Sequence, residues 1–439
     1  MDMDRTKLYR IVVVGGGFGG LRTALELDKR RARIGKCEVT VVDRQCEHVY
    51  TPLLYEVCAG ELETSGVEPV KALRSGVAFS LPAFMGSLRH GRLKFAHGAV
   101  QAIDHEAKTV TLDGGRVLPF DTIVLSPGVT INTFGVPGVE ESACMLKPLG
   151  GSLMVRQKLC QAVEALGKGA TSVRVVVCGA GATGTEFASE VAHWMLGMES
   201  SGQWKAGTGK VTLVEAGPSL LAMFPARTQV CARDRLVQLR IDLRLQTAVT
   251  GMEQGRVHVK NVVDGKEQQE TIEADVIVWT AGIKPHAAVA TWGVALDAKG
   301  SIDIEPTFHV KNMPNVYALG DATVFLHPKT HARVPALAQA AIKQASIVAE
   351  NIVRALERKL PIIWTPPEKW ISVIPLGGAY AVTNIGHVTV SGYPGFVIRR
   401  AVDLIYFLSI LPPRAAWRIW RKGMEEFGKN DVRATIPVI

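Results

Sequence analysis

Two glycine-rich segments of the chain have the spacing Gly-x-Gly-x-x-Gly. The first is 15–20 (GGGFGG) and the second is 179–184 (GAGATG). In such a segment the first glycine permits a tight turn, the second lets a pyrophosphate reach the backbone, and the third lets a helix pack closely on a strand. The N-terminus of that helix then faces the phosphates, where its N–H groups favour negative charge. The predicted chemistry is the binding of two dinucleotides by one chain.

An acidic residue ends the strand-like run that follows each glycine segment. Asp43 ends the run 39–42 (VTVV), and Glu215 ends the run 211–214 (VTLV). A carboxylate at this place accepts hydrogen bonds from ribose hydroxyls and repels a 2′-phosphate. The residues after Glu215 (216–218, AGP) include no arginine that could pair with a 2′-phosphate, so NADH is favoured over NADPH. The alternative is an acid that merely faces water at the end of a strand.

These residues require two copies of one strand–turn–helix–strand arrangement to position them. The apolar runs 9–14 (YRIVVV) and 173–178 (VRVVVC) are typical of buried parallel strands, and apolar residues at helical spacing follow each glycine segment. The longer gap before the second acid is filled by 197–209 (GMESSGQWKAGTG), which we expect to form a surface loop. The predicted fold class is α/β, with two Rossmann-like dinucleotide-binding domains, one inserted in the other, and a C-terminal membrane-associating segment.

The remaining segments extend this plan. We expect 275–279 (DVIVW) and 315–319 (NVYAL) to be strands that return to the first domain, and 334–356 to be a long helix. From Pro361 the composition shifts to proline, tryptophan and arginine. The predicted domains are a discontinuous first dinucleotide domain (1–150 and 272–360), a second dinucleotide domain (151–271) and a C-terminal membrane-anchoring or dimerisation segment (361–439).

Composition excludes several classes of protein. The 439 residues are 47% hydrophobic and 21% charged, which excludes a disordered chain. The net charge of +9 is spread without a Lys/Arg run, so no nucleic-acid-binding arm is expected. The seven cysteines contain no Cys-x-x-Cys pair, so we expect neither a disulfide framework nor a metal site, and a reducing compartment. The N-terminus (MDMDR) is not typical of a secretory signal, and no apolar stretch reaches the ~18–20 residues that span a bilayer.

Four further segments carry a resemblance to a known family. They are 48–60 (HVYTPLLYEVCAG), 278–282 (VWTAG), 318–321 (ALGD) and 335–344 (PALAQAAIKQ). Together with the glycine segments they resemble type II NADH:quinone oxidoreductases, over about residues 9 to 427. The resemblance implies that the first unit binds FAD and the second binds NADH. It also implies that hydride passes from NADH to the flavin, and that two electrons then pass to a membrane quinone without proton pumping.

The same resemblance implies roles for individual side chains. Glu186 and Glu190 would face the nicotinamide and the flavin, and Lys369 would lie near the flavin and could pair with one of them. Gln339 would sit against the flavin and Gln344 near the quinone. The catalytic residues are thus Glu186, Gln339, Gln344 and Lys369. The implied cofactor-binding residues are Gly15, Gly17, Phe18, Gly19, Gly20, Asp43, Arg44, Thr51, Pro52, Leu53, Val100, Ser126, Pro127, Gly128, Asp321, Ala338, Gln339, Gly179, Gly181, Thr183, Gly184, Glu186, Glu215 and Gly282.

The end of the chain is typical of a helix that lies in a membrane interface. Four cations share one helical face, namely Arg414, Arg418, Arg421 and Lys422. Apolar residues share another, namely Trp417, Trp420, Met424 and Phe427. A basic face flanked by tryptophan favours the membrane–water boundary. We therefore expect a peripheral protein on the cytoplasmic face of a bacterial inner membrane, or on an organelle inner or thylakoid membrane, and a possible homodimer. A dimer or core-packing helix is the alternative.

Other functions remain open from the sequence alone. A soluble NADH-dependent ferredoxin or rubredoxin reductase, or another member of the flavin disulfide-reductase superfamily, would share the dinucleotide folds but would lack this tail. A sulfide:quinone oxidoreductase would need a pair of cysteines at the flavin, and Cys160 has no late-chain partner because no cysteine lies beyond Cys231. A non-enzymatic flavin-bound scaffold is a further alternative. At single positions, Glu190 could be a solvated helix residue, and Lys343 stands where the family usually has a glutamine, so it could be a plain surface lysine.

Overall fold

The computed structural model describes residues 8–60, 62–63, 66–88, 93–263 and 265–432. The chain folds into two compact units. Unit 1 contains Met1–Val49, Ala78–Thr130 and Ile283–Glu368, and unit 2 contains Tyr50–Val77, Ile131–Gly282 and Lys369–Ile439. The chain from 369 onward is grouped with unit 2, and so is the segment 50–77. The three-part division expected from the sequence stays a prediction.

Unit 1 is built on a six-stranded sheet with the order β20-β21-β9-β1-β2-β5. Every neighbouring pair in it is parallel except the antiparallel pair β20 and β21. The strands of this sheet are β1 (Tyr9–Val14), β2 (Cys37–Asp43), β5 (Leu93–His97), β9 (Thr122–Leu125), β20 (His309–Val310) and β21 (Met313–Ala318). Its helices are α1 (Phe18–Lys29), α2 (Arg31–Ile34), α5 (Leu81–Gly86) and α10 (Ala338–Leu356). The smaller elements are β3 (Glu47–Val49), β4 (Ala78–Ser80), β6 (Val100–Asp104), β7 (Thr109–Leu112), η2 (Asp113–Gly115), β8 (Val117–Pro119), β19 (Ile283–Pro285) and η3 (Ala287–Thr291), and β10 (Val129–Ile131) crosses the unit boundary.

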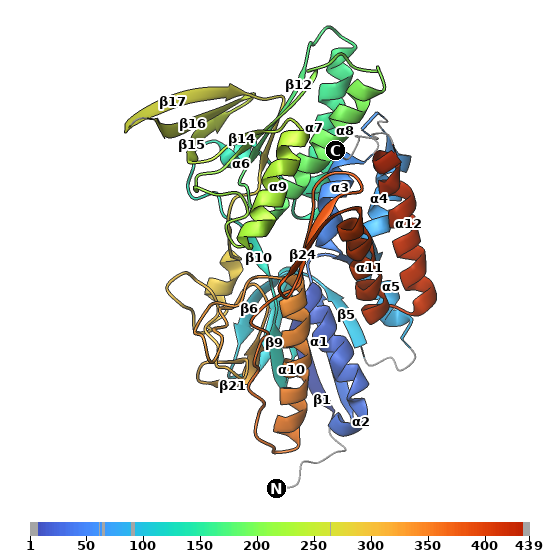
Figure 1. Cartoon of the computed structure of the whole chain (residues 1–439). Coiled ribbons are helices and arrows are strands. Elements are labelled where there is room, and N and C mark those ends of the chain that lie inside the picture. Colours follow the sequence, from blue (N-terminus) through green and yellow to red (C-terminus); the bar gives the residue numbers. More distant parts are fainter. Residues whose placement is uncertain (1–7, 61, 64–65, 89–92, 264, 433–439) are drawn as a thin grey trace. The chain divides into compact units, whose positions relative to one another are not determined.

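Helices α1 and α10 lie side by side in unit 1 (Figure 1). Arg33 of α2 ties that helix to the C-terminal end of α10, because its guanidinium contacts Glu350 at 2.8 Å and Glu357 at 2.8 Å. The expected helix over 334–356 is confirmed at its C-terminal end, Leu356, but it begins four residues later than expected, at Ala338. Leu337 is the N-cap of the helix, and its backbone is extended. A helix start at 334 is disfavoured because Pro335 restricts the backbone of the residue before it.

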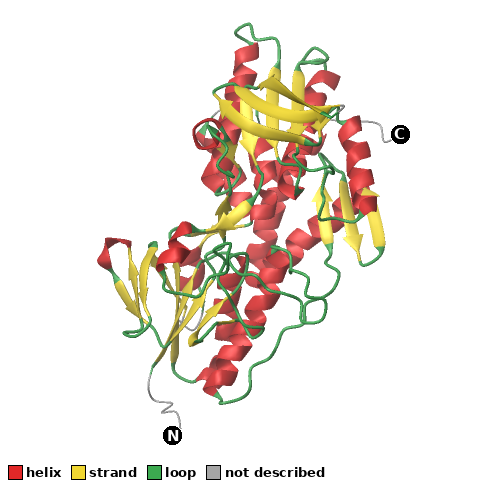
Figure 2. Ribbon diagram, turned by 90° about the vertical axis from the view of Figure 1, so that its left-hand side faces the viewer, coloured by secondary structure: helices red, strands yellow, loops and turns green. Residues whose placement is uncertain are grey.

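Unit 2 repeats the plan with a five-stranded parallel sheet of order β11-β18-β12-β13-β14. Its strands are β11 (Cys144–Met145), β12 (Val173–Cys178), β13 (Gly209–Val214), β14 (Asp242–Arg244) and β18 (Val276–Trp279). Antiparallel sheets are formed by β15 (Thr247–Glu253), β16 (Arg256–Val263) and β17 (Lys266–Glu273), and by β22 (Ser372–Pro375), β23 (Ala381–Ile385) and β24 (Val388–Gly392). The helices are η1 (Thr51–Leu53), α3 (Leu54–Ala59), α4 (Val67–Val77), α6 (Val139–Ser142), α7 (Leu149–Leu166), α8 (Ala182–Ser200), α9 (Ala226–Gln238), α11 (Tyr393–Ile410) and α12 (Pro413–Val432). Figure 2 shows helices flanking the strands within each unit.

Two local expectations for unit 2 need correction. The surface loop expected at 197–209 is shorter, because α8 continues to Ser200. The apolar face expected for the last helix is also divided. Phe427 is 2% exposed and packs beside Gly76 of α4, whereas Trp417 is 51% exposed. The core-facing side of α12 therefore carries small and apolar residues that the sequence pattern did not separate from the tryptophans, namely Ala416, Ile419, Gly423 and Phe427.

Within the described ranges, no helix has both the length and the apolar character needed to cross a membrane. The same residues contain no group of three or more His, Cys, Asp or Glu side chains that could hold a metal ion.

The close packing of the second glycine turn gives a stability prediction. A Cβ at Gly184 would lie 1.9 Å from the carbonyl oxygen of Gly179, whereas a Cβ at Gly181 would meet nothing within 4 Å. We therefore expect Gly184→Ala to lower the free energy of unfolding by about 1–3 kcal/mol, because the strand and helix must separate. Gly181→Ala is the matched control and should leave it within about 0.5 kcal/mol. Chemical denaturation without nucleotide measures both, and equal stabilities would contradict this packing.

Candidate functional site

The first glycine turn joins β1 to α1 and leaves room for a ligand at one position only. Gly15 has φ +102°, and a Cβ there would lie 2.1 Å from the carbonyl oxygen of Ser126. A Cβ at Gly20 would lie 1.8 Å from the carbonyl oxygen of Gly15. Gly17 is exposed and has open space beside it. The turn is thus closed on the protein side and open where the pyrophosphate is expected.

Asp43 is tied to this turn by its carboxylate. Its Oδ2 accepts a hydrogen bond from the Gly16 N–H at 2.6 Å, and its Oδ1 accepts one from the Gln45 N–H at 2.7 Å. Each carboxylate oxygen can accept a second hydrogen bond. The carboxylate is therefore fixed at the end of β2, with acceptor capacity left for ribose hydroxyls.

The second glycine turn repeats this arrangement. Glu215 ends the run of β13, and its Oε2 accepts a hydrogen bond from the Ala180 N–H at 2.8 Å. Its Oε1 accepts one from the Gly217 N–H at 2.8 Å. Glu215 thus relates to its turn as Asp43 relates to the first. The residues present fit an adenosine diphosphate group at both turns. In each turn, glycines leave the backbone open to the pyrophosphate, and a carboxylate held by backbone N–H groups lies beside it.

The loop after β18 lies against the second turn. The Thr280 hydroxyl lies 3.0 Å from the Cys178 and Gly179 carbonyl oxygens, to which it can donate. A Cβ at Gly179 would lie 2.8 Å from the Ala281 nitrogen. Gly282, which follows, has φ +71° and lies beside the ring of Phe134. In this fold the dinucleotide crosses the carboxyl ends of the strands, so the loop 280–282 borders the half of the site beyond the pyrophosphate.

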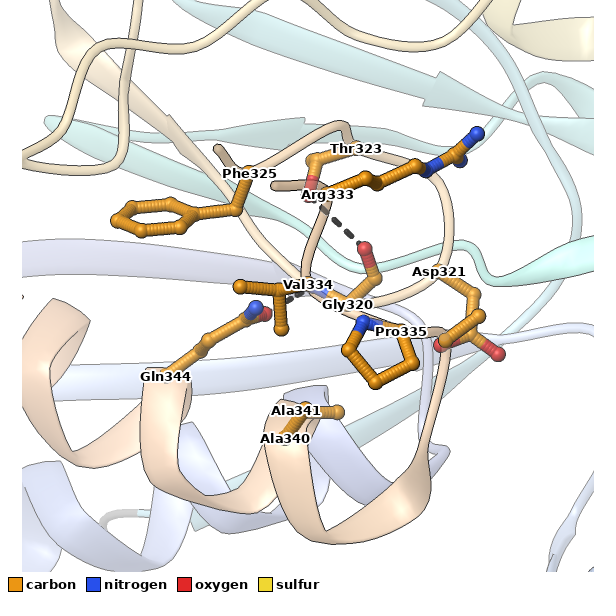
Figure 3. Close-up of a pocket in the computed structure, with 11 residues that line it drawn as sticks. Gly320, Asp321, Thr323, Phe325, Arg333, Val334, Pro335, Ala340, Ala341 and Gln344 are labelled. Carbon is orange, nitrogen blue, oxygen red and sulfur yellow. Dashed lines mark hydrogen bonds between the residues drawn. The ribbon is translucent and has the colours of Figure 1, made fainter. Parts of the chain in front are cut away.

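Gln344 takes part in unit 1 as a buried anchor. Its Oε1 accepts a hydrogen bond from the Gly320 N–H at 2.8 Å, and the Thr323 hydroxyl donates to the Gly320 carbonyl at 2.9 Å (Figure 3). These residues line a pocket together with Asp321, Arg333 and Pro335. The structure therefore gives Gln344 the role of fixing the turn that carries Asp321. Its contact with a quinone stays a prediction.

His48 was not expected from sequence reasoning as a site residue. It is 1% exposed, and its Nδ1 lies 2.9 Å from the carbonyl oxygen of Gly16, which can only accept. Its ring also meets Phe18 edge-on, with the centroids 5.4 Å apart. Burial lowers the pKa of His48 to about 4, so the ring is neutral and supports the glycine turn. The sequence signal for it was its place at the start of the segment 48–60.

The other expected cofactor residues of unit 1 occupy varied environments. Arg44 is exposed, with Nη1 3.0 Å from Nε2 of His286. Ser126 is buried, and its N–H donates to the Val14 carbonyl at 2.8 Å. Val100 is buried in β6. The remaining expected residues are at the ends of elements: Phe18 begins α1, Gly19 follows it, Pro127 and Gly128 follow β9, and Ala338 and Gln339 begin α10.

In unit 2, two acids extend from α8 behind the second glycine turn, where Thr183 is half-buried in the first turn of the helix. Glu186 is half-buried, and desolvation of its carboxyl raises its pKa to about 8. Glu190 is 4% exposed, and its Oε2 accepts a hydrogen bond from the Gly378 N–H at 3.3 Å. The interpretation of Glu190 as a solvated helix residue is therefore wrong.

Lys369 does not pair with these acids as expected. Its side chain is exposed, and its Nζ lies 2.9 and 3.0 Å from the two ring nitrogens of His387. The cations that act on Glu186 are instead Arg399 and Lys147. Lys369 lies just before β22, and His387 lies between β23 and β24 of the same antiparallel sheet. The pairing of these strands, which the local sequence does not specify, therefore brings the two side chains together. Whether it reaches a bound flavin stays a prediction.

A buried arginine fixes the loop that faces Glu190. Arg235 of α9 donates from Nε to the Leu376 carbonyl at 3.1 Å and from Nη2 to the Gly377 carbonyl at 3.1 Å. Its guanidinium carbon also lies 4.7 Å from the Tyr380 ring centroid. Sequence reasoning missed Arg235, since its partners are backbone atoms more than 140 positions away.

Segment 50–60, expected at the flavin, forms η1 and α3 in unit 2. Thr51, Pro52 and Leu53 form η1, directly before α3. Glu56 of α3 is 4% exposed and forms a buried ion pair with Arg399 of α11. Sequence reasoning missed this ion pair, because its two residues are 343 positions apart.

Comparisons with known proteins agree with this description. The type II NADH:quinone oxidoreductase of Haemophilus influenzae is 27% identical over 383 residues, which cover 80% of this chain and 82% of that protein. The demethylphylloquinone reductase NdbB of Synechocystis sp. is 26% identical over 406 residues, covering 91% of this chain and 92% of that protein.

Solved structures show the same fold. NDH2 from Plasmodium falciparum in complex with NADH superimposes with a TM-score of 0.80 at 16% identity, covering 96% of this chain and 99% of that one. The sulfide:quinone oxidoreductase from Aquifex aeolicus superimposes with a TM-score of 0.72 at 20% identity, covering 98% and 96%. The model of the family described as pyridine nucleotide-disulphide oxidoreductase matches residues 9–345. With both dinucleotide turns inside the matched segment, this chain belongs to the pyridine nucleotide-disulphide oxidoreductase family.

Proposed function

We propose that this protein is a type II NADH:quinone oxidoreductase, which oxidises NADH and reduces a membrane quinone without pumping protons. The observation that carries the proposal is the duplicated site, in which Asp43 and Glu215 are each anchored to a glycine turn. Two such sites in one chain fit one resident dinucleotide and one exchanging dinucleotide. The named relatives from Haemophilus influenzae and Mycobacterium tuberculosis support NADH as donor and quinone as acceptor.

The residues of each unit have distinct tasks in this reaction. Unit 1 would hold FAD through the first glycine turn, Asp43 and the Ser126–Gly128 crossover. Bound FAD supplies a two-electron carrier that takes hydride and passes electrons on. Unit 2 would hold NADH through the second turn, with Glu215 on the adenosine ribose and the loop 280–282 beside the nicotinamide half. The carboxylate of Glu215 excludes a 2′-phosphate by charge repulsion.

Glu186 is the group in unit 2 best suited to handle protons. The overall reaction consumes one proton besides the transferred hydride for each NADH oxidised. A side chain whose pKa lies near the working pH exchanges protons most effectively. The pKa of Glu186, raised to about 8 by burial, meets that condition. We assign Glu186 to proton exchange at the site, with Gln339 and Gln344 as the proposed flavin-side and quinone-side amides and Lys369 as a proposed flavin neighbour.

A surface of unit 2 fits the interface of a membrane. Helix α11 exposes a continuous apolar stripe on the side opposite its buried face, made of Tyr393, Val397, Ile405 and Leu408. Helix α12 adds exposed Trp417 and the cations Arg414, Arg418, Arg421 and Lys422. An apolar stripe beside a basic face favours an anionic membrane surface. We propose that this combined face, rather than α12 alone, lies on the membrane, at the cytoplasmic side in a bacterium. A homodimer remains a further proposal.

The main test is the reaction itself. Purified protein should be yellow and release FAD on heating, because the first turn fits an adenosine diphosphate group. It should then oxidise NADH with a soluble short-chain quinone as acceptor. Release of FMN alone would contradict the cofactor assignment. Electron transfer to a ferredoxin or rubredoxin but not to any quinone would favour the soluble reductase instead.

Nucleotide choice gives a second test. Removing the anchored acceptor in Glu215→Ala should weaken NADH binding by roughly 10–150-fold, and it should narrow the preference over NADPH. Asp242→Ala, which removes an exposed carboxylate near the same sheet, is the matched control and should change neither. Kinetic constants for both nucleotides measure the effect. If Glu215→Ala left them unchanged, Glu215 would not belong to the site.

Membrane binding is tested by flotation with anionic liposomes. The double variant Ile405→Ser and Leu408→Ser should bind about tenfold or more weakly, since each substitution removes about 1 kcal/mol of apolar burial. Val230→Ser with Val237→Ser on α9 is the control, because those valines are also exposed but lie outside the stripe. Turnover with a soluble quinone should be retained in both. Equal flotation of the stripe variant and the parent would show that the stripe does not meet the membrane.

A further inference from the structure

We infer that Arg399, which lies on the C-terminal helix α11, sets the charge balance around the acid Glu186 and is therefore a positioning residue of the active site. This inference rests on the proposed function and extends it. The helix that is proposed to lie on the membrane would also tune the proton-exchanging group of the site. Nothing in the sequence pattern of α11 indicated such a role.

The geometry begins with a buried cluster between α3 and α11. The Nη2 of Arg399 forms an ion pair with Oε1 of Glu56, and both side chains are 6% exposed. The Tyr55 hydroxyl donates to the same Glu56 oxygen at 2.9 Å, and Arg400 Nη1 lies 3.5 Å from it. The guanidinium carbon of Arg399 lies 5.5 Å from the Tyr55 ring centroid. A cation enclosed in this way is screened little by solvent, so its field extends to neighbouring groups.

The buried cluster is connected to the helix of Glu186 through α3. Helix α3 packs against α8, the helix that carries Glu186. The charged groups that act on Glu186 come from three elements: Arg399 from α11, Lys147 from the segment before α7, and Glu56 from α3. Burial raises the pKa of Glu186, the two cations oppose the rise, and the Glu56 carboxylate adds to it. Burial raises the pKa of the Tyr55 hydroxyl, and the charges of Glu186 and Glu190, which both lie on α8, also raise it.

Arg399 is the stronger of the two cations for a physical reason. Lys147 is exposed, so solvent and salt screen its charge. Arg399 is enclosed, and a guanidinium stays charged at all working pH values. Lys369, which was expected to pair with one of the α8 acids, is exposed and lies beside His387. Arg399 is therefore the buried cation whose charge acts on Glu186, although its own ion-pair partner is Glu56 of α3.

The signs of the effects follow directly. Without the Arg399 cation, less opposes the desolvation of Glu186, so its pKa rises. Without the Glu56 carboxylate, one anion that raised this pKa is gone and Arg399 loses its partner, so the pKa falls. The two substitutions shift the ionisation of Glu186 in opposite directions, whether that carboxyl donates or accepts the proton in turnover.

The experiment compares pH–rate profiles of the FAD-loaded enzyme with NADH and a soluble quinone. We expect the limb that belongs to Glu186 to move up by about one pH unit in Arg399→Met and down in Glu56→Gln. Glu186→Gln identifies that limb by removing it. Arg399→Lys should restore part of the shift, because it restores the cation. Arg233→Met, which removes an exposed arginine from α9, is the control and should leave the limb in place.

Two features keep this test decisive. If Arg399→Met does not fold, the double variant Glu56→Gln with Arg399→Met removes the whole buried pair, which cores often tolerate. In this double variant, the Glu186 limb of the pH–rate profile should lie at a higher pH than in Glu56→Gln alone. Infrared titration of the Glu186 carboxyl gives a readout that does not depend on quinone reduction, so the inference can be judged even if the proposed reaction fails. Limbs that move together, or lowered activity with unmoved limbs and carboxyl titration, would show that the pair is only structural.

Discussion

A carboxylate that accepts a hydrogen bond from the backbone of a glycine turn is the interaction on which this structure depends. Asp43 holds Gly16 and Glu215 holds Ala180, each at the carboxyl end of a strand in a mostly parallel sheet. The turn is glycine-rich because the strand, turn and helix approach too closely for a Cβ. The acid orders the turn and at the same time keeps acceptor capacity for a ribose. The same carboxylate thus stabilises the glycine turn and is available to bind the ribose. This arrangement occurs twice in the chain.

The parts of the molecule that follow from local sequence were predictable. The β-branched runs 9–14 and 173–178 form β1 and β12, and the strands expected at 275–279 and 315–319 form β18 and β21 to within a few residues. The expectation that both strands return to the first domain is wrong for β18, which pairs with β12 in the sheet of unit 2, whereas β21 does lie in the sheet of unit 1. The fold class and the membership of the pyridine nucleotide-disulphide oxidoreductase family are confirmed. These predictions succeed because glycine spacing and apolar periodicity constrain the backbone over ten to thirty residues, which is the length of one strand–turn–helix unit.

The interactions between distant segments could not be predicted in the same way. Lys369 meets His387 rather than an acid of α8, and Gln344 is used to anchor Gly320. In α11 and α12, charged and apolar residues alternate in a way that suits a surface helix. The structure instead encloses Arg399 with Glu56 and exposes a stripe of apolar side chains on the other side of α11. A single helix therefore has one face that is buried in unit 2 and one face that is exposed, and periodicity alone does not say which is which.

The central claim is that one chain binds two dinucleotides and passes electrons between them and a quinone. Anaerobic stopped-flow spectroscopy of the flavin tests it most directly. The account predicts that one equivalent of NADH bleaches the flavin absorbance and that a quinone added afterwards restores it, with both steps fast enough to support steady turnover. A flavin that NADH does not bleach, or one that stays reduced when quinone is added, would contradict it.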